Sequence, residues 1–177
     1  MCLLQPDKLF SHITQVDISR DILDYSIQAV LIDIDNTIRP RGQKDIPRDV
    51  LTWIRKVQTA GLTVCFLSNN FHQNVYELSS SINVSVVAKA LKPLPIGYLR
   101  ASLKLHLPLK YMLMIGDQLF TDILGAHLVG MRAYLVAPLV ENDLKHTQML
   151  RSLEARILKE PRPEATPVGV LKSDLIE

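Results

Sequence analysis

The alternation of apolar and amphipathic segments predicts an α/β fold, a three-layer sandwich around a central parallel sheet of about five strands. Five short runs are almost wholly apolar, as expected of strands that are covered on both faces. Stretches of helical period separate these runs, and strands that are joined by helices pair in parallel. The expected strands cover residues 27–32, 62–67, 85–88, 111–115 and 132–136.

Helices are expected between these strands and after the last one. Pro47 suits the first turn of a helix that ends before Gly61. Three further helices are expected over residues 71–80, 95–106 and 119–129, and an amphipathic one over residues 146–159. Prolines are frequent from position 161 onward, which favours a loose tail. We therefore expect one domain over residues 1–160 and a flexible tail over residues 161–177.

Composition narrows the class of protein. The net charge of +2 is too small to argue for nucleic acid as a partner. The two cysteines form no disulfide framework, so a reducing cytoplasmic setting is the expected location. No apolar run approaches the roughly 20 residues of a transmembrane helix. Contact with the inner face of a membrane would therefore be peripheral.

Two acidic motifs follow expected strands. Asp33 and Asp35 come directly after the first strand, where unpaired buried charges would be costly unless they bound a metal. A surface turn is the alternative interpretation of this pair. After the fourth strand, Gly116 permits a sharp turn, and Asp117 and Asp122 lie at the start of a helix. Carboxylates of this kind are ligands for Mg²⁺, whereas an N-cap role for Asp117 would leave Asp122 unexplained.

Two other polar motifs are weaker when taken alone. Ser68 and Asn69 follow the second strand and could donate hydrogen bonds to phosphate, although they also suit an ordinary turn. Lys92 precedes a helix and could neutralise a phosphate or a carboxylate, although a solvated surface lysine is the simpler interpretation. Because ligands bind beyond the carboxyl ends of parallel strands, all of these side chains are expected to converge at one edge.

The order of the four motifs resembles that of the haloacid dehalogenase (HAD) superfamily, over roughly residues 28–130. The resemblance implies a Rossmann-like sheet and a reaction in which Asp33 is the nucleophile and Asp35 the general acid and base. It also implies that phosphate is bound by Thr37, Ser68, Asn69 and Lys92, and that Mg²⁺ is bound by Asp33, Asp35, Asp117 and Asp122. An acid two residues after the nucleophile favours phosphatase or phosphomutase activity over dehalogenation.

The segments between the motifs are too short for a cap domain. Residues 38–67 and 71–91 hold only a helix and a strand each besides loops. The chain therefore resembles the capless phosphatases of subclass IIIA. An uncapped site is open to large substrates or to a covering subunit, so a homo-oligomer is a further expectation.

The residues within and around these motifs resemble those of the YqeG-like phosphatidylglycerophosphate phosphatases. The matching segments are Leu4–Pro6 and residues 33–37, 67–70, 90–93, 116–122 and 151–158. This resemblance implies a phosphomonoester substrate on a lipid head group at a membrane surface, in phosphatidylglycerol synthesis. The alternatives are a phosphatase for a soluble sugar phosphate, nucleotide phosphate or phosphoprotein, and a binding module whose catalysis has decayed.

Two groups of residues are candidates for membrane contact. Leu9, Phe10 and Ile13 would either touch the bilayer or pack on the domain. Arg39 and Arg41 would either face anionic head groups or be solvated loop charges.

Overall fold

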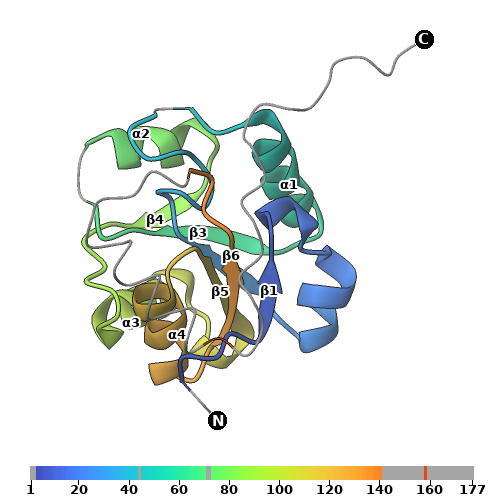
Figure 1. Cartoon of the computed structure of the whole chain (residues 1–177), viewed down its shortest axis with the longest axis vertical. Helices are drawn as coiled ribbons and strands as arrows, with labels where there is room; N and C mark the ends of the chain where they lie inside the picture. The colour runs from blue at the N-terminus through green and yellow to red at the C-terminus, as the bar shows by residue number, and fades with distance from the viewer. Residues whose placement is uncertain (1–2, 44, 71–72, 141–157, 159–177) are drawn as a thin grey trace.

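A computed structural model of the chain has a six-stranded parallel sheet with helices on both faces (Figure 1). It describes residues 3–43, 45–70, 73–140 and 158. The strand order is β1-β6-β5-β2-β3-β4, and all neighbouring strands pair in parallel. The strands are β1 (Lys8–Phe10), β2 (Ala29–Ile32), β3 (Thr63–Leu67), β4 (Ser85–Val87), β5 (Met112–Gly116) and β6 (Arg132–Val136). The predicted α/β fold is confirmed.

The side chains of β2 alternate between two cores. Val30 and Ile32 belong to the cluster under α1 (Arg48–Thr59) and α2 (Gln73–Ser81). Ala29 and Leu31 belong to the cluster under α3 (Pro95–Leu105) and α4 (Leu124–Leu128). All four strand residues are fully buried, which explains why the strand is apolar without a polar alternation.

The strand β1 was not expected from the sequence. It lies at the sheet edge beside β6, with Lys8 opposite Tyr134. Phe10 packs on the Tyr134 ring with a centroid distance of 5.7 Å, and Ile13 is buried in the same core. Leu9 is partly buried on the other face. The interpretation that Leu9, Phe10 and Ile13 pack on the domain is confirmed.

The helix expected over residues 119–129 is divided in two. Residues Leu119–Ile123 form one π-helical turn, and α4 follows from Leu124. The carbonyl of Gln118 accepts bonds from the backbone N–H groups of Asp122 and Ile123, which widens the turn. The widened turn leaves Asp122 pointing back at the sheet edge rather than along a regular helix.

Several expectations concern residues at the end of the chain. The helix over residues 146–159 and the tail over residues 161–177 lie outside the described residues, apart from Leu158. Within the described ranges, no helix is long and apolar enough to cross a membrane. The described segments between β2 and β5 hold α1, β3, α2, β4 and α3, and none of them forms a separate cap.

The strand order reverses beside β2. Along the chain, β3 and β4 are added on one side of β2, and β5 and β6 are then added on the other side. The connections on the two sides diverge at such a point, which opens a crevice at the carboxyl ends of the two central strands. In this fold the crevice lies beyond Ile32 and Gly116, the last residues of β2 and β5.

Candidate active site

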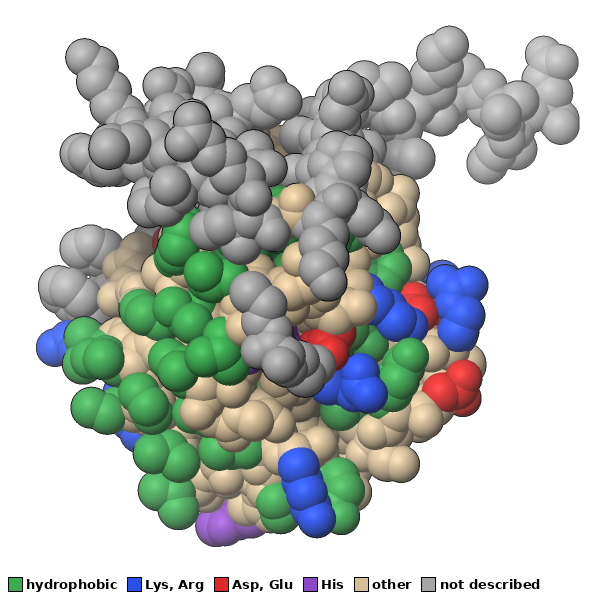
Figure 2. Space-filling view, turned by 60° about the horizontal axis from the view of Figure 1, so that its bottom comes forward, with side chains coloured by type: hydrophobic (Ala, Val, Ile, Leu, Met, Phe, Trp, Pro, Cys, Tyr) green, Lys and Arg blue, Asp and Glu red, His purple; other side chains and the backbone are tan. Residues whose placement is uncertain are grey.

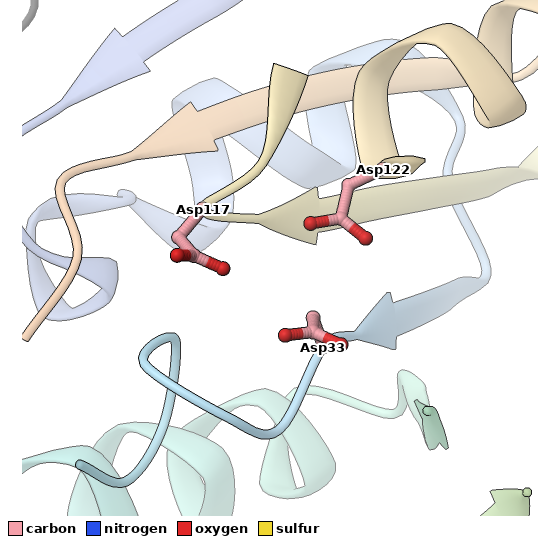
Figure 3. Close-up of side chains that lie close together, drawn as sticks. All are labelled: Asp33, Asp117 and Asp122. Atoms are coloured by element: carbon pink, nitrogen blue, oxygen red, sulfur yellow. The ribbon is translucent and has the colours of Figure 1, made fainter. Parts of the chain in front are cut away.

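Three buried aspartates meet at the crevice between β2 and β5 (Figure 3). Asp33 follows β2 and its backbone N–H donates to the carbonyl of Ile115 at 3.0 Å, which continues the strand pairing. Asp117 follows β5, and Asp122 comes from the π-helical turn. One carboxylate oxygen of each aspartate lies within 4.8 Å of the others. The structure therefore places the acids of the first and fourth motifs together.

The position of Asp122 depends on a glycine. Its Oδ2 accepts a bond from the backbone N–H of Gln118 at 3.1 Å. A side-chain carbon at Gly116 would overlap the Asp122 carboxylate, so the absence of a Cβ there creates the space for this group. Tyr98 fixes the same turn by donating its hydroxyl to the carbonyl of Thr121 at 2.9 Å.

Lys92 provides a positive charge to this cluster. Its ammonium group donates to Asp33 Oδ1 and, at 2.7 Å, to Asp122 Oδ1. Burial alone would lower the pKa of Lys92, but the charges on Asp122 and Asp33 raise it, so the lysine stays protonated. The interpretation of Lys92 as a solvated surface lysine is wrong, since the side chain is buried.

The nucleophile candidate has an unusual environment. Burial raises the pKa of Asp33 to about 7. The positive charge of Lys92 lowers this pKa, but the negative charges of Asp122 and Asp35 partly cancel that effect. One lysine thus faces three buried carboxylates within this cluster. Excess buried negative charge of this kind is stabilised by a bound cation, and carboxylates are ligands of a hard divalent ion. The donor set fits a Mg²⁺ ion.

Ser68 and Asn69 reach the crevice from the end of β3. The Ser68 hydroxyl is buried and accepts a bond from the backbone N–H of Asn70 at 3.0 Å. Its own proton is available to a ligand in the crevice. The Asn69 amide instead engages Lys92, accepting from its N–H at 2.7 Å and donating to its carbonyl at 3.1 Å. These contacts give Asn69 a geometric role in holding Lys92, in addition to a position on the crevice wall.

Thr37 and Asp35 differ in their surroundings. Thr37 is buried, and its hydroxyl donates to Asp117 Oδ1 at 3.3 Å, so it orients an acid of the cluster. The Asp35 side chain is half-buried and lies 3.5 Å from the Arg39 guanidinium. Its carboxylate is not part of the three-acid cluster, which leaves its backbone carbonyl as the metal-ligand candidate.

Comparisons with known proteins show similarity to hydrolases and phosphatases. A family model described as HAD-hydrolase-like matches residues 90–152, which include Lys92, Asp117 and Asp122. "Probable phosphatase YqeG" from Bacillus subtilis (strain 168) is 28% identical over 153 residues, covering 86% of this chain and 88% of that protein. The chain is similar to HAD-like hydrolases over residues 90–152 and to this probable phosphatase over most of its length. The resemblance to this superfamily that the motifs indicated is confirmed.

Solved structures share the fold of this chain at low identity. A HAD phosphatase from Thermococcus onnurineus gives a TM-score of 0.55 at 15% identity, covering 72% of this chain and 97% of that chain. A putative HAD-like phosphatase from Mesorhizobium loti gives 0.50 at 19% identity, covering 74% and 86%. At such identities the likeness concerns the fold alone.

The pocket contains residues that the sequence analysis did not single out as ligand-binding. Gln118 and Thr121 join the expected side chains on its wall, and Arg41, a candidate for head-group contact, lies there as well. Gln118 and Thr121 lie inside the acidic motif, and that spacing could have indicated them. The full lining is Asp33, Asp35, Arg41, Ser68, Asn69, Asn70, Lys92, Gln118 and Thr121.

Arg39 requires a correction. It was expected either to face head groups or to be a solvated charge, yet it is 2% exposed and its guanidinium lies against Asp35. The loop after β2 folds back on itself, with the backbone N–H of Asn36 donating to the carbonyl of Arg39 at 2.8 Å. This local bond turns Arg39 inward, whereas Arg41 remains exposed at the mouth of the pocket.

Proposed function

We propose that this protein is a Mg²⁺-dependent phosphomonoesterase that works through a phosphorylated Asp33. The observation that carries the proposal is the contact of buried Asp33 with Lys92, inside a pocket that also contains Ser68. A lysine ammonium beside the attacking carboxylate offsets charge as a phosphate dianion approaches. The hydroxyl of Ser68, on the same pocket wall, can donate a hydrogen bond to a phosphoryl oxygen.

The first step forms a bond from an Asp33 carboxylate oxygen to phosphorus and breaks the bond from phosphorus to the substrate alcohol oxygen. Asp35 borders the same pocket and is partly exposed, so it can give a proton to the departing alkoxide. In the second step Asp35 takes a proton from water, which attacks phosphorus. The bond from phosphorus to Asp33 then breaks, and inorganic phosphate leaves.

The metal would be held by Asp33, Asp117 and the backbone carbonyl of Asp35, with Asp122 as a further ligand or a supporting group. When bound, Mg²⁺ supplies positive charge that neutralises the phosphate and the carboxylates around it. Thr37 restrains Asp117, and Lys92 restrains both Asp33 and Asp122. These contacts orient the acids before the substrate arrives.

For the substrate we propose a lipid phosphomonoester, with phosphatidylglycerophosphate as the first candidate. The resemblance to the YqeG-like branch supports this choice. The pocket mouth supports it as well, since it has no cap among the described elements and exposes Arg41, a cation suited to an anionic head group. Such an enzyme would act from the cytoplasmic side as a peripheral protein.

A substrate panel tests the proposal in two stages. Mg²⁺-dependent release of phosphate from an aryl phosphate, abolished by a chelator, is expected of a phosphomonoesterase and not of a decayed binding module. Turnover of phosphatidylglycerophosphate in mixed micelles is then compared with turnover of sugar phosphates, nucleotides and a phosphopeptide. A higher kcat/KM on any soluble compound would overturn the lipid assignment and leave the phosphomonoesterase intact.

A further inference from the structure

The outer face of α3 is apolar. This helix buries Tyr98 against the sheet, as a core-facing side chain should be. On the opposite side, Ile96, Leu99 and Leu103 are 50%, 48% and 74% exposed. Their spacing of three and four residues places them on one stripe of the helix. A helix that only had to cover the sheet would carry polar side chains there, so packing among the described residues does not account for the stripe.

The exposed apolar residues continue to the sequence neighbours of Lys92, which lies in the pocket wall. Leu91 and Leu94 stand on either side of Lys92 and Pro93 in the sequence, and they are 53% and 52% exposed. Lys92 itself points into the pocket, where it contacts Asp33 and Asp122. Figure 2 shows hydrophobic side chains gathered on its left half, on the side where Figure 1 places α3 and α4.

Cations accompany this surface and acids are absent from its sequence. Between Glu77 and Asp117 the chain contains no aspartate or glutamate. The same stretch contains four exposed basic residues, Lys89, Arg100, Lys104 and Lys110. The Arg100 guanidinium donates to the carbonyls of Ala88 and Lys89 at 3.0 Å, which holds its charge beside the stripe.

We propose that Leu91, Leu94 and the stripe Ile96, Leu99 and Leu103 form a docking face for an anionic lipid bilayer. Apolar side chains enter the boundary between head groups and acyl chains, while basic residues at their margin attract the anionic surface. This docking turns the mouth of the pocket toward the head groups. The inference deepens the proposed lipid phosphatase and rests on that function for its substrate.

The charges favour a bilayer over a second copy of the chain. In a two-fold dimer the same face meets itself, so the cations of this stretch would meet their own copies without opposing acids from the same stretch. An anionic membrane supplies the missing negative charge. Leu91 and Leu94, the exposed leucines around Lys92, would then bring the lipid phosphate close to the pocket without extracting the lipid from the membrane.

Vesicle flotation of the full chain tests the docking face without turnover. The probes are phosphatidylcholine vesicles with and without phosphatidylserine, whose head group carries no phosphomonoester. We expect binding that requires phosphatidylserine and weakens with added salt. Replacing two exposed stripe residues by glutamate (Leu99→Glu with Leu103→Glu) should weaken it more than about tenfold. The control Leu23→Glu changes an exposed leucine outside this face and should bind as the wild type does.

Three outcomes would overturn the docking face. In the first, the wild-type protein does not bind anionic vesicles. In the second, the double variant is folded, as its melting curve shows, and binds as tightly as the wild type. In the third, the wild type is a dimer and the double variant is a monomer. Aryl phosphate hydrolysis by the wild type is measured in parallel. If the vesicles bind but the aryl phosphate is not hydrolysed, the docking face stands and the proposed phosphomonoesterase fails.

Discussion

Asn69 holds the backbone of Lys92 at both of its polar groups, although the two residues lie 23 positions apart. The amide oxygen accepts from the Lys92 N–H and the amide nitrogen donates to the Lys92 carbonyl. This pair of bonds ties the end of β3 to the segment that enters α3. The ammonium of Lys92 therefore reaches Asp33 from a backbone that is fixed on the neighbouring strand.

Asn69→Ala should lower kcat on an aryl phosphate by about 10- to 100-fold, because a small displacement of Lys92 removes its charge from the reacting group. KM should change little, since the substrate contacts of Ser68 remain. The lost bonds should cost about 1–2 kcal/mol of unfolding free energy. Steady-state kinetics and urea unfolding measure the two effects. Gln58→Ala removes an amide on α1 and should leave kcat unchanged; equal losses in both variants would contradict the positioning role.

Asp33→Asn should reduce turnover by at least about a thousandfold, because an amide cannot form the phosphorylated intermediate. The fold should survive, since the substitution removes a buried charge whose pKa is raised by burial. Thermal melting and phosphate release are the measurements. Asp45→Asn, at an exposed position, is the control. Substantial residual hydrolysis by Asp33→Asn would refute Asp33 as the nucleophile.

Mg²⁺ should raise the melting temperature of the wild-type chain. A ligand at about 100 times its Kd stabilises by about 2.7 kcal/mol, or roughly 5–10 °C for a chain of this size. Asp117→Asn should lose most of this rise because the substitution removes one carboxylate of the cluster. Differential scanning fluorimetry with sodium chloride at matched ionic strength is the comparison. The same rise in wild type and Asp117→Asn would remove Asp117 from the metal site.

Gly116→Ala should impair both stability and activity, because the added carbon overlaps the Asp122 carboxylate. Overpacking of this kind costs about 1–3 kcal/mol, and the displaced acid would weaken Mg²⁺ binding. The matched control is Gly61→Ala, where φ is +84° and the added carbon meets nothing within 4 Å. That variant should lose about 1 kcal/mol from backbone strain alone. Its catalytic rate should match the wild type, whereas that of Gly116→Ala should not.

Acid should destabilise the fold partly through Asp21. Burial raises the pKa of Asp21, but hydrogen bonds from Arg20 and Lys8 outweigh it and lower the pKa to about 2. A carboxyl with a depressed folded pKa stabilises the fold above its unfolded value near 3.9. That contribution is lost as the pH falls through about 2. Asp21→Asn should therefore be most destabilising above about pH 4, and its deficit in urea unfolding should shrink toward about pH 2; an unchanged deficit would contradict this linkage.

The central strands were predictable because a strand buried on both faces must be apolar throughout. The runs expected over residues 27–32 and 111–115 correspond to β2 and β5, with ends shifted by one or two residues. The edge strand β1 was not predictable in this way. It has three residues, all partly buried, and its place in the sheet depends on pairing with β6. Local periodicity does not encode a pairing between such distant segments.

The acids of the site were accessible to sequence reasoning because each follows a recognisable strand. The partners of these side chains were not. The sequence alone indicates that Arg39 is a charged loop residue, but the chain reversal at Asn36 turns its side chain inward. Asn69 reads as a phosphate-binding amide, but its partner lies on another loop. Hydrogen bonds of this kind depend on tertiary distances, which a motif does not specify.

The pairing of β1 with β6 imposes an order on biosynthesis. Residues 8–10 emerge from the ribosome when their neighbour, residues 132–136, has yet to be translated. Until then the polar backbone of β1 has no partner strand, and β5, the other strand that pairs with β6, offers an open edge to other chains. The pairing of the N-terminal segment with β6 thus completes the sheet late in synthesis. Slowing translation just before residue 132 would prolong the interval in which the nascent protein is prone to aggregate.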